Sequence, residues 1–183
     1  MFKKFMKRYG YYMLAFVAIL AIGLTAGAIN KENNAPAIPT DTTEVEMVCP
    51  MTSPDVIKWY SDTELFYNTT LKQWESHKGV DLTSTASPDV FAVLDGTITS
   101  CSYSYEDGYQ ITITHSDGLS TTYSSLKNID GIKKGDSVTR GQKIGEVSNS
   151  ASNESLDGNH LHFQVMLNGK KVDPANYITF ENK

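Results

Sequence analysis

The stretch HLHFQVML, residues 160–167, alternates polar and apolar side chains from His160 to Val165. In a β-strand, successive side chains point to opposite faces of the sheet. One face of this strand would then be apolar and belong to the core: Leu161, Phe163, Val165 and Leu167. The opposite face carries His160 and His162, about 6.5–7 Å apart along the strand. The pair alone fits two exposed strand histidines as well as it fits a metal site.

Short β-branched runs separated by turn residues occupy the sequence upstream of this strand. VFAVL (90–94) leads into Asp95-Gly96, and further Asp-Gly pairs at 107–108 and 117–118 precede YQITITH and LSTTYSSL. Such pairs between β-branched runs are strong hairpin signals. We therefore predict a mainly β fold, a compact antiparallel structure arranged as a sandwich or a partly open barrel. A short helix is expected over residues 53–60, with Pro54 in its first turn.

The charge balance of the chain is acidic and uneven. The 183 residues include 16 Lys+Arg and 21 Asp+Glu, a formal net charge of −5. This balance argues against a nucleic-acid-binding protein, whose footprint would be a basic patch. The first acidic residue is Glu32. Four basic residues lie within the first eight positions: Lys3, Lys4, Lys7 and Arg8.

Residues 11–29, YYMLAFVAILAIGLTAGAI, carry no charge. A helix of this length spans about 28 Å, close to the hydrocarbon core of a bilayer. The basic residues before it would stay on the cytoplasmic side. We predict a cytoplasmic segment over 1–10, a single transmembrane anchor over 11–29, a polar linker over 30–46 and an extracytoplasmic domain over 47–183. The alternative is a cleaved signal peptide, because Ala26-Gly27-Ala28 resembles a cleavage site.

Two cysteines, Cys49 and Cys101, lie in the exported part of the chain. An extracytoplasmic compartment permits a disulfide between them, and two separate thiols are the alternative. No other cysteine is present, so a thiolate zinc site is excluded.

A second histidine motif, His77-Lys78-Gly79-Val80-Asp81, precedes the β-rich region. In an extended strand its His and Asp would be about 13 Å apart, so we expect Gly79 to allow a turn that joins them. Imidazole nitrogen and carboxylate oxygen are both zinc ligands. Combined with the His160/His162 pair, the motif predicts a catalytic-type zinc site with two His, one Asp and an open water position. His115, at the end of a predicted strand, is expected to be structural.

Four segments together resemble peptidase family M23, the LytM or lysostaphin-type endopeptidases: HKGVDL (77–82), ITHSDGLSTTYSSL (113–126), VTRGQKIGEVS (138–148) and HLHFQVMLNGKKVDPANYI (160–178). The resemblance covers about residues 74–179. It implies a LytM-like fold with a duplicated hybrid motif, Zn2+ held by His77, Asp81 and His162, and His160 as general base or acid. Members of the family cut peptide crossbridges or stems of peptidoglycan.

One position departs from the family pattern. Active members carry Tyr-x-His-Leu, and this chain has Tyr123-Ser124-Ser125-Leu126, with Ser125 in place of the second catalytic His. A hydroxyl cannot become an imidazolium beside a developing oxyanion, and losing one such donor costs roughly 10²–10³ in rate. We expect a retained zinc site with weak or absent turnover. The polar loop over 148–158 is either a wall of a substrate groove or a plain surface connection.

The segment DVIKWYSDTELFYNTTLKQWESHKGVDL, residues 55–82, resembles a sporulation branch of the family, the Q-type stage II sporulation proteins. That resemblance implies a location in the forespore membrane and pairing with an AH-type stage III sporulation protein during engulfment. Three functional hypotheses stay open. One is a sporulation assembly protein with a degenerate active site, and another is an active zinc endopeptidase that cuts peptidoglycan peptides. The third is an activator that binds a wall hydrolase, as degenerate members of the family can.

Overall fold

The computed structural model describes residues 46–180 of the chain. The predicted segments 1–10 and 11–29, and the predicted linker apart from Glu46, lie outside these residues. Within the described range no helix is both long enough and apolar enough to cross a membrane.

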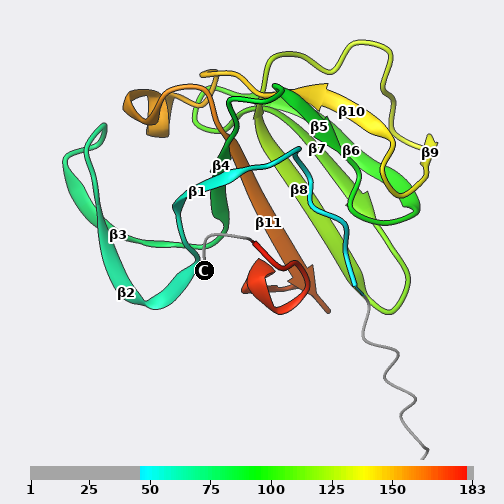
Figure 1. The fold of residues 1–183 in the computed structure, drawn as a ribbon, viewed down its shortest axis with the longest axis horizontal. Helices are drawn as coiled ribbons and strands as arrows, with labels where there is room; N and C mark the ends of the chain where they lie inside the picture. Colours follow the sequence, from blue (N-terminus) through cyan, green and yellow to red (C-terminus); the bar gives the residue numbers. More distant parts are fainter. Residues whose placement is uncertain (1–45, 181–183) are drawn as a thin grey trace, which may run out of the picture. The chain divides into compact units, whose positions relative to one another are not determined.

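An antiparallel sheet of eight strands forms the centre of the described region (Figure 1). Its strand order is β1-β4-β11-β8-β7-β6-β9, and β12 pairs with the far end of β11. The strands are β1 (Asp55–Lys58), β4 (Val80–Thr83), β6 (Gly96–Ser104), β7 (Gly108–Thr114), β8 (Leu119–Leu126), β9 (Ser137–Val138), β11 (Leu161–Leu167) and β12 (Lys170–Val172). The path begins at β1 and ends at β9, so this sheet does not close into a barrel. The prediction of a mainly β, antiparallel fold is confirmed.

Two smaller sheets and two short helices complete the described part of the fold. One sheet pairs β5 (Asp89–Phe91) with β10 (Lys143–Glu146). The other is the hairpin of β2 (Ser61–Asn68) and β3 (Gln73–His77), which projects from the main sheet in Figure 1. The 3-10 helices are η1 (Ser152–Asp157), which lies in the loop before β11, and η2 (Pro174–Asn176).

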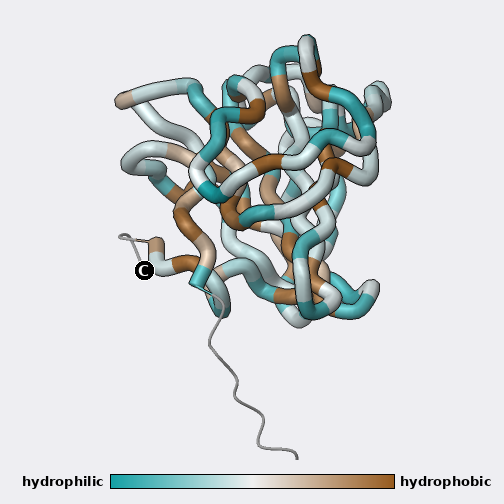
Figure 2. The backbone as a smooth tube through the Cα atoms, turned by 90° about the vertical axis from the view of Figure 1, so that its right-hand side faces the viewer, coloured by the Kyte–Doolittle hydropathy of each residue, from teal (hydrophilic) through white to brown (hydrophobic). Residues whose placement is uncertain are grey.

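The core lies against the apolar face of β11, as its alternation predicts. Leu161, Phe163 and Val165 are fully buried. The Tyr123 ring of β8 packs 5.3 Å from the Phe163 ring, and its hydroxyl accepts a hydrogen bond from the Val93 backbone N–H at 3.0 Å. Figure 2 shows hydrophobic backbone running through the interior, with hydrophilic segments in the outer turns. The polar face of β11 is therefore free to build a site.

The predicted helix over residues 53–60 is wrong, because this segment forms strand β1. β1 pairs with β4 in the register Val56 opposite Leu82 and Lys58 opposite Asp81. The β-branched pair Val56-Ile57 favours extended backbone, and the exposed edge of β4 supplies hydrogen-bond partners that a lone helical turn lacks. This pairing places Lys58 beside the metal motif.

Cys49 and Cys101 both lie within the described residues, and they are not joined in a disulfide. The alternative of two separate thiols is the one observed.

Candidate metal centre

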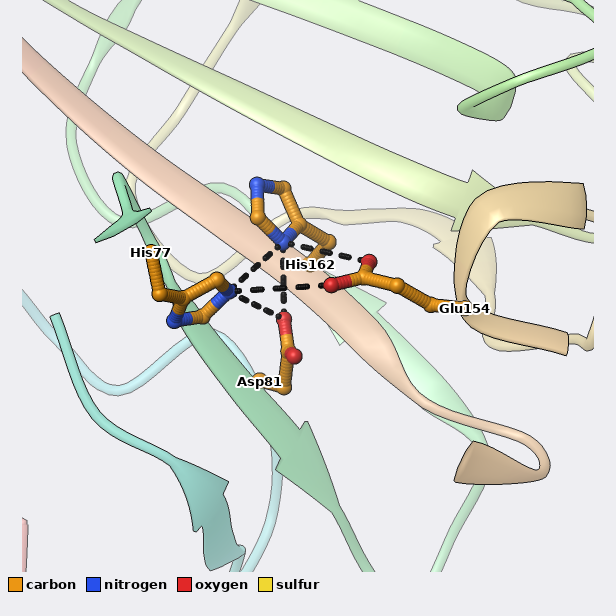
Figure 3. Close-up of side chains that lie close together, drawn as sticks. All are labelled: His77, Asp81, Glu154 and His162. Atoms are coloured by element: carbon orange, nitrogen blue, oxygen red, sulfur yellow. Dashed lines mark hydrogen bonds and ion pairs between the residues drawn. The ribbon is translucent and has the colours of Figure 1, made fainter. Parts of the chain in front are cut away.

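Three of the predicted site residues converge from separate strands on the polar face of β11 (Figure 3). His77 ends β3, Asp81 lies in β4, and His162 in β11 pairs directly opposite Asp81 in the sheet. Directly opposed residues of antiparallel strands share a face and touch. The His162 Nδ1 lies 2.7 Å from Asp81 Oδ1, and the His77 Nε2 lies 3.2 Å from both of these atoms. The sequence prediction that these side chains meet is confirmed.

Gly79 joins His77 to Asp81 for a different reason from the one expected. Its backbone is not in the left-handed region. A Cβ at this position would lie 2.6 Å from the Phe163 carbonyl oxygen and 3.0 Å from His162 Nε2. Glycine is needed here because the chain passes close to β11.

A fourth side chain, Glu154 of η1, enters the same group. Its Oε2 lies 3.5 Å from His162 Nδ1, and its Oε1 lies 3.9 Å from His77 Nε2. One ligand atom from each of the four residues lies within 4.8 Å of all the others, an arrangement that could hold a metal ion. Sequence reasoning missed Glu154 because it lies in an irregular loop, where no periodicity tells which side chains point inward. The loop over 148–158 is thus part of the site.

Lys58 is the second contributor that the sequence did not reveal. Its ammonium lies 3.0 Å from Asp81 Oδ2, 2.9 Å from Glu154 Oε1 and 2.9 Å from Asp157 Oδ2. The prediction of a helix over 53–60 concealed it, since only the β1–β4 register brings it beside Asp81. The lysine supplies the positive charge that two nearly buried carboxylates require.

Hydrogen bonds outside the group orient the two imidazoles. The His77 Nδ1–H donates to the Trp59 carbonyl at 2.9 Å, so Nε2 is the ring nitrogen that faces Asp81 and His162. The His162 Nε2 accepts a hydrogen bond from the Gln164 side-chain N–H at 2.8 Å. Metal-binding histidines characteristically donate their second ring N–H to an oxygen, as His77 does, so the surroundings of His77 fit a ligand role.

The charges of the group shift the pKa values of its members. Burial alone would raise the pKa of Glu154, but hydrogen bonding to His160 and the nearby cations lower it to about 2. The pKa of Asp81 is likewise held well below its usual value, since the hydrogen bonds from His162 and His77 outweigh the effect of burial. Burial would lower the pKa of Lys58, yet Asp81 and Glu154 raise it overall. Both carboxylates are ionised at neutral pH.

His160, predicted to be catalytic, is fully buried beside the group. Its Nδ1–H donates to the Gly158 carbonyl at 2.9 Å, and its Nε2 lies 3.5 Å from Glu154 Oε2. Burial lowers the pKa of His160, and the nearby Glu154 and Asp81 more than compensate, so the net shift is upward. The ring thus faces Glu154, with a nitrogen available for proton exchange.

Ser125 is buried and faces the backbone. Its hydroxyl donates to the Ser148 carbonyl at 2.9 Å, and the same carbonyl accepts the His160 backbone N–H at 3.1 Å. Ser125 has a positive φ of 62°, a conformation that histidine adopts more readily than most residues. The hydroxyl stabilises the loop that carries the site.

His115 lies apart from this group, as expected for a structural residue. Its Nδ1–H donates to the Asp95 carbonyl at 2.8 Å, and its Nε2 lies 2.8 Å from the Thr121 hydroxyl. Burial lowers the pKa of His115 below its usual value. Both ring nitrogens are therefore used within the fold.

The model of the family described as "Peptidase family M23" matches residues 75–174, a range that holds both histidine motifs and Glu154. The chain belongs to peptidase family M23. Family membership agrees with the antiparallel fold and with the convergence of the HxxxD and HxH motifs. The match begins downstream of Lys58, so the lysine lies outside the residues that the family model matches.

Similar proteins fall into a sporulation group and a peptidase group. The chain is 31% identical to the stage II sporulation protein Q of Bacillus subtilis over 82% of its own length and 53% of that protein. It is 29% identical to the peptidoglycan DD-endopeptidase ShyC of Vibrio cholerae over 56% of its own length and 23% of that enzyme. The chain thus spans about half or less of these relatives.

The fold also matches a chain of the solved SpoIIQ–SpoIIIAH pore forming complex. The TM-score is 0.64 at 27% identity, and the match covers 74% of this chain and 92% of the other. The protein is thus an M23 domain related to stage II sporulation protein Q and to peptidoglycan endopeptidases.

Proposed function

We propose that this protein is a membrane-anchored M23 domain that binds Zn2+ and acts as an assembly or channel component of sporulation, with weak or no peptidase turnover. The convergence of His77, Asp81 and His162 is the observation that carries the zinc-binding part of this proposal. The likeness to stage II sporulation protein Q over most of the chain supports the sporulation part.

Zinc suits the donor set and its dimensions. The ion prefers imidazole nitrogen and carboxylate oxygen in a tetrahedral arrangement, at about 2.0–2.2 Å. Neighbouring ligand atoms of a tetrahedron with bonds of about 2.0–2.1 Å lie roughly 3.3–3.4 Å apart. The contacts of the His77 Nε2 with Asp81 Oδ1 and with His162 Nδ1 are both 3.2 Å. These three atoms need only small movements to become zinc ligands.

The altered catalytic constellation supports weak turnover. His160 is in place beside the proposed metal position, but Ser125 stands where active relatives carry a second histidine. The hydroxyl of Ser125 is already committed to the Ser148 carbonyl. A zinc ion with an open position would polarise a bound carbonyl and acidify water, but no imidazole at position 125 would stabilise the developing oxyanion.

The partner proposed for this chain is an AH-type stage III sporulation protein. A related chain has been solved in a complex with SpoIIIAH. The β2–β3 hairpin offers a surface for it, because five of the eight large hydrophobic residues exposed in the described part lie on this hairpin or next to its turn: Leu65, Tyr67, Leu71, Trp74 and Leu156. Clustered exposed apolar residues with aromatic members are typical of binding surfaces.

The location proposed is the forespore membrane, with the M23 domain in the space between the two membranes. The uncharged stretch over residues 11–29 and the four basic residues before it support a single anchor with a cytoplasmic N-terminus. The linker over 30–46 would then separate the domain from the bilayer.

Metal analysis and a digestion assay on purified residues 45–183 test the zinc-binding and turnover parts. We expect one zinc per chain, loss of that zinc in His77→Ala, and retention in His115→Gln, a histidine variant outside the group. Incubation with peptidoglycan should release far fewer peptides than an active family peptidase does. Undiminished zinc in His77→Ala would show that the ligands are wrongly assigned.

The alternative function is an active zinc endopeptidase that cuts peptidoglycan peptides. The complete ligand set and the buried His160 favour it. Abundant release of peptides by the wild-type domain, abolished in His160→Ala, would establish this alternative and overturn the assembly role with a degenerate site.

The partner proposal has its own test with the purified extracytoplasmic domain of the AH-type protein from the same organism. Replacing Tyr67 and Trp74 together by Ser should weaken binding at least tenfold, as aromatic anchors of an interface do. The control is Tyr105→Ser, which removes an exposed tyrosine from the β6–β7 turn. Equal affinity of all three proteins would exclude the hairpin as the docking surface.

A further inference from the structure

Glu154 approaches the metal group from the side that the three sheet ligands leave open. Figure 3 shows His77, Asp81 and His162 extending from strands of the fold, while Glu154 reaches in from η1. A catalytic zinc site keeps this fourth position for water or substrate, whereas a structural site fills it with a protein ligand. The side chain at this position therefore decides which kind of site the chain has.

We infer that Glu154 is the fourth protein ligand of the metal, so that the centre is a closed, structural one without a water position. The inference rests on the zinc binding proposed above. The Glu154 Oε2 lies 3.5 Å from His162 Nδ1, close to the roughly 3.3–3.4 Å expected between tetrahedral ligands, and the Oε1 of the same carboxylate lies 3.9 Å from His77 Nε2. A small movement of the η1 loop brings the carboxylate to bonding distance.

The two carboxylates of the group each place one oxygen beside His162 and the other beside the Lys58 ammonium. Asp81 directs Oδ1 to the histidines and Oδ2 to Lys58. Glu154 directs Oε2 to His162 and His160, and its Oε1 lies 2.9 Å from the Lys58 ammonium and 3.9 Å from His77 Nε2. Each acid thus has one oxygen beside His162 and one held by an ammonium, the outer contact that orients ligating carboxylates. Glu154 is arranged like Asp81, whose position in the motif marks it as a ligand.

The charges of the group balance when Glu154 is ionised and a divalent ion is bound. A divalent ion and Lys58 supply three positive charges, and Asp81, Glu154 and Asp157, all within 3.0 Å of the Lys58 ammonium, supply three negative ones. The imidazoles of His77 and His162 are neutral when they bind a metal. A group of charges that sums to zero costs a mostly buried site the least free energy.

A metal held in this way would fasten η1 to the sheet, and η1 in turn contacts the β2–β3 hairpin. The Asn153 carbonyl accepts a hydrogen bond from the Asn68 side chain at 2.9 Å, and the Leu156 N–H donates to the Thr70 hydroxyl at 3.2 Å. Metal binding therefore stabilises the hairpin proposed as the partner surface, through the loop that holds Glu154.

Cobalt substitution tests the closed centre on the wild-type domain. Four-coordinate Co2+ absorbs visible light more strongly than five- or six-coordinate Co2+, so its spectrum reports an added ligand. We expect inorganic phosphate to leave the wild-type spectrum unchanged and to shift the spectrum of Glu154→Ala, which has an open position. An equally large shift in the wild type would overturn the inference.

Zinc affinity, measured by competition with a chelator, provides the second test. Loss of an outer contact costs roughly 10–100-fold in affinity, so loss of a direct ligand in Glu154→Gln should cost about 100-fold or more. The matched control is Asp157→Asn, which removes the same charge from the same helix but contacts only Lys58. Equal losses in the two variants would mean that Glu154 acts through charge alone, and no loss in Glu154→Gln would also refute the inference.

Hydrogen exchange separates this inference from the proposed function. Zinc should slow amide exchange in η1 and in β2–β3 of the wild type, and the slowing in η1 should be lost in Glu154→Gln saturated with zinc. A wild type that binds no zinc would refute the proposed zinc binding itself. Zinc binding without any slowing of exchange in η1 would refute only the role of Glu154 as a ligand that fastens this loop.

Discussion

The Lys58 ammonium lies 3.0 Å from Asp81 Oδ2, and the two residues are paired in the β1–β4 register. Asp81 is fully buried, and the lysine side chain is only 17% exposed. An ion pair so far from solvent is weakly screened, and its value depends on both partners being present. The Lys58 ammonium thus already lies among the carboxylates that would bind the metal ion.

Lys58→Met should destabilise the metal-free domain by roughly 3–5 kcal/mol, because it leaves Asp81 and Glu154 buried without their counter-charge. Zinc should restore part of this loss, since it supplies positive charge to the same carboxylates. Urea unfolding with and without a chelator measures both effects. The control is Lys127→Met, which removes an exposed ion pair with Glu146 and should cost at most about 1 kcal/mol.

Gln164→Leu should lower zinc affinity by roughly 10–100-fold, the usual cost of losing an outer contact to a ligating histidine. The Gln164 amide nitrogen lies 2.8 Å from His162 Nε2. When Nδ1 binds the metal, Nε2 carries the proton, and the amide must turn over to present its oxygen as the acceptor. Gln164→Glu, which keeps an acceptor there, should retain most of the affinity. Chelator competition measures the three affinities, and equal values would show that the contact is dispensable.

Zinc affinity should fall as the pH drops from 8 to 5, by about tenfold per pH unit for each proton that zinc must displace. Burial lowers the pKa of His162, but the hydrogen bond and charge of Asp81 raise it overall. The metal-free imidazole therefore holds its proton above the usual histidine value, and the decline should begin above about pH 6.5. With a pKa of about 2, Glu154 stays ionised throughout this range. A constant affinity between pH 8 and 5 would contradict the histidine ligands.

Tyr123→Phe should destabilise the domain by about 1–3 kcal/mol, because it leaves the buried Val93 N–H without an acceptor. Burial raises the pKa of Tyr123 to about 12, so its phenol remains protonated and the wild-type bond persists throughout the neutral range. Thermal unfolding of the chelated proteins measures the effect. Tyr103→Phe, at a more than half-exposed position, should stay within about 0.5 kcal/mol of the wild type.

Alternation and motif spacing predicted much of the described fold and three of the four clustered residues. The HLHFQVML pattern predicted which face of β11 is buried, because side-chain direction in a strand follows from local backbone geometry alone. The HxxxD and HxH motifs predicted that His77, Asp81 and His162 meet. These residues lie in or at the ends of regular strands, where local geometry fixes the direction of a side chain.

The sequence by itself determined an acidic, mainly β chain of family M23 with paired histidine motifs and a serine at position 125. Only the tertiary structure decided that residues 55–58 pair with β4 as a strand, and that Lys58 and Glu154 join the group. Lys58 and Glu154 are 96 positions apart, and a short segment such as 55–58 takes its conformation from the strand it pairs with. Contacts over such separations follow from strand pairing and loop packing, which no local pattern encodes.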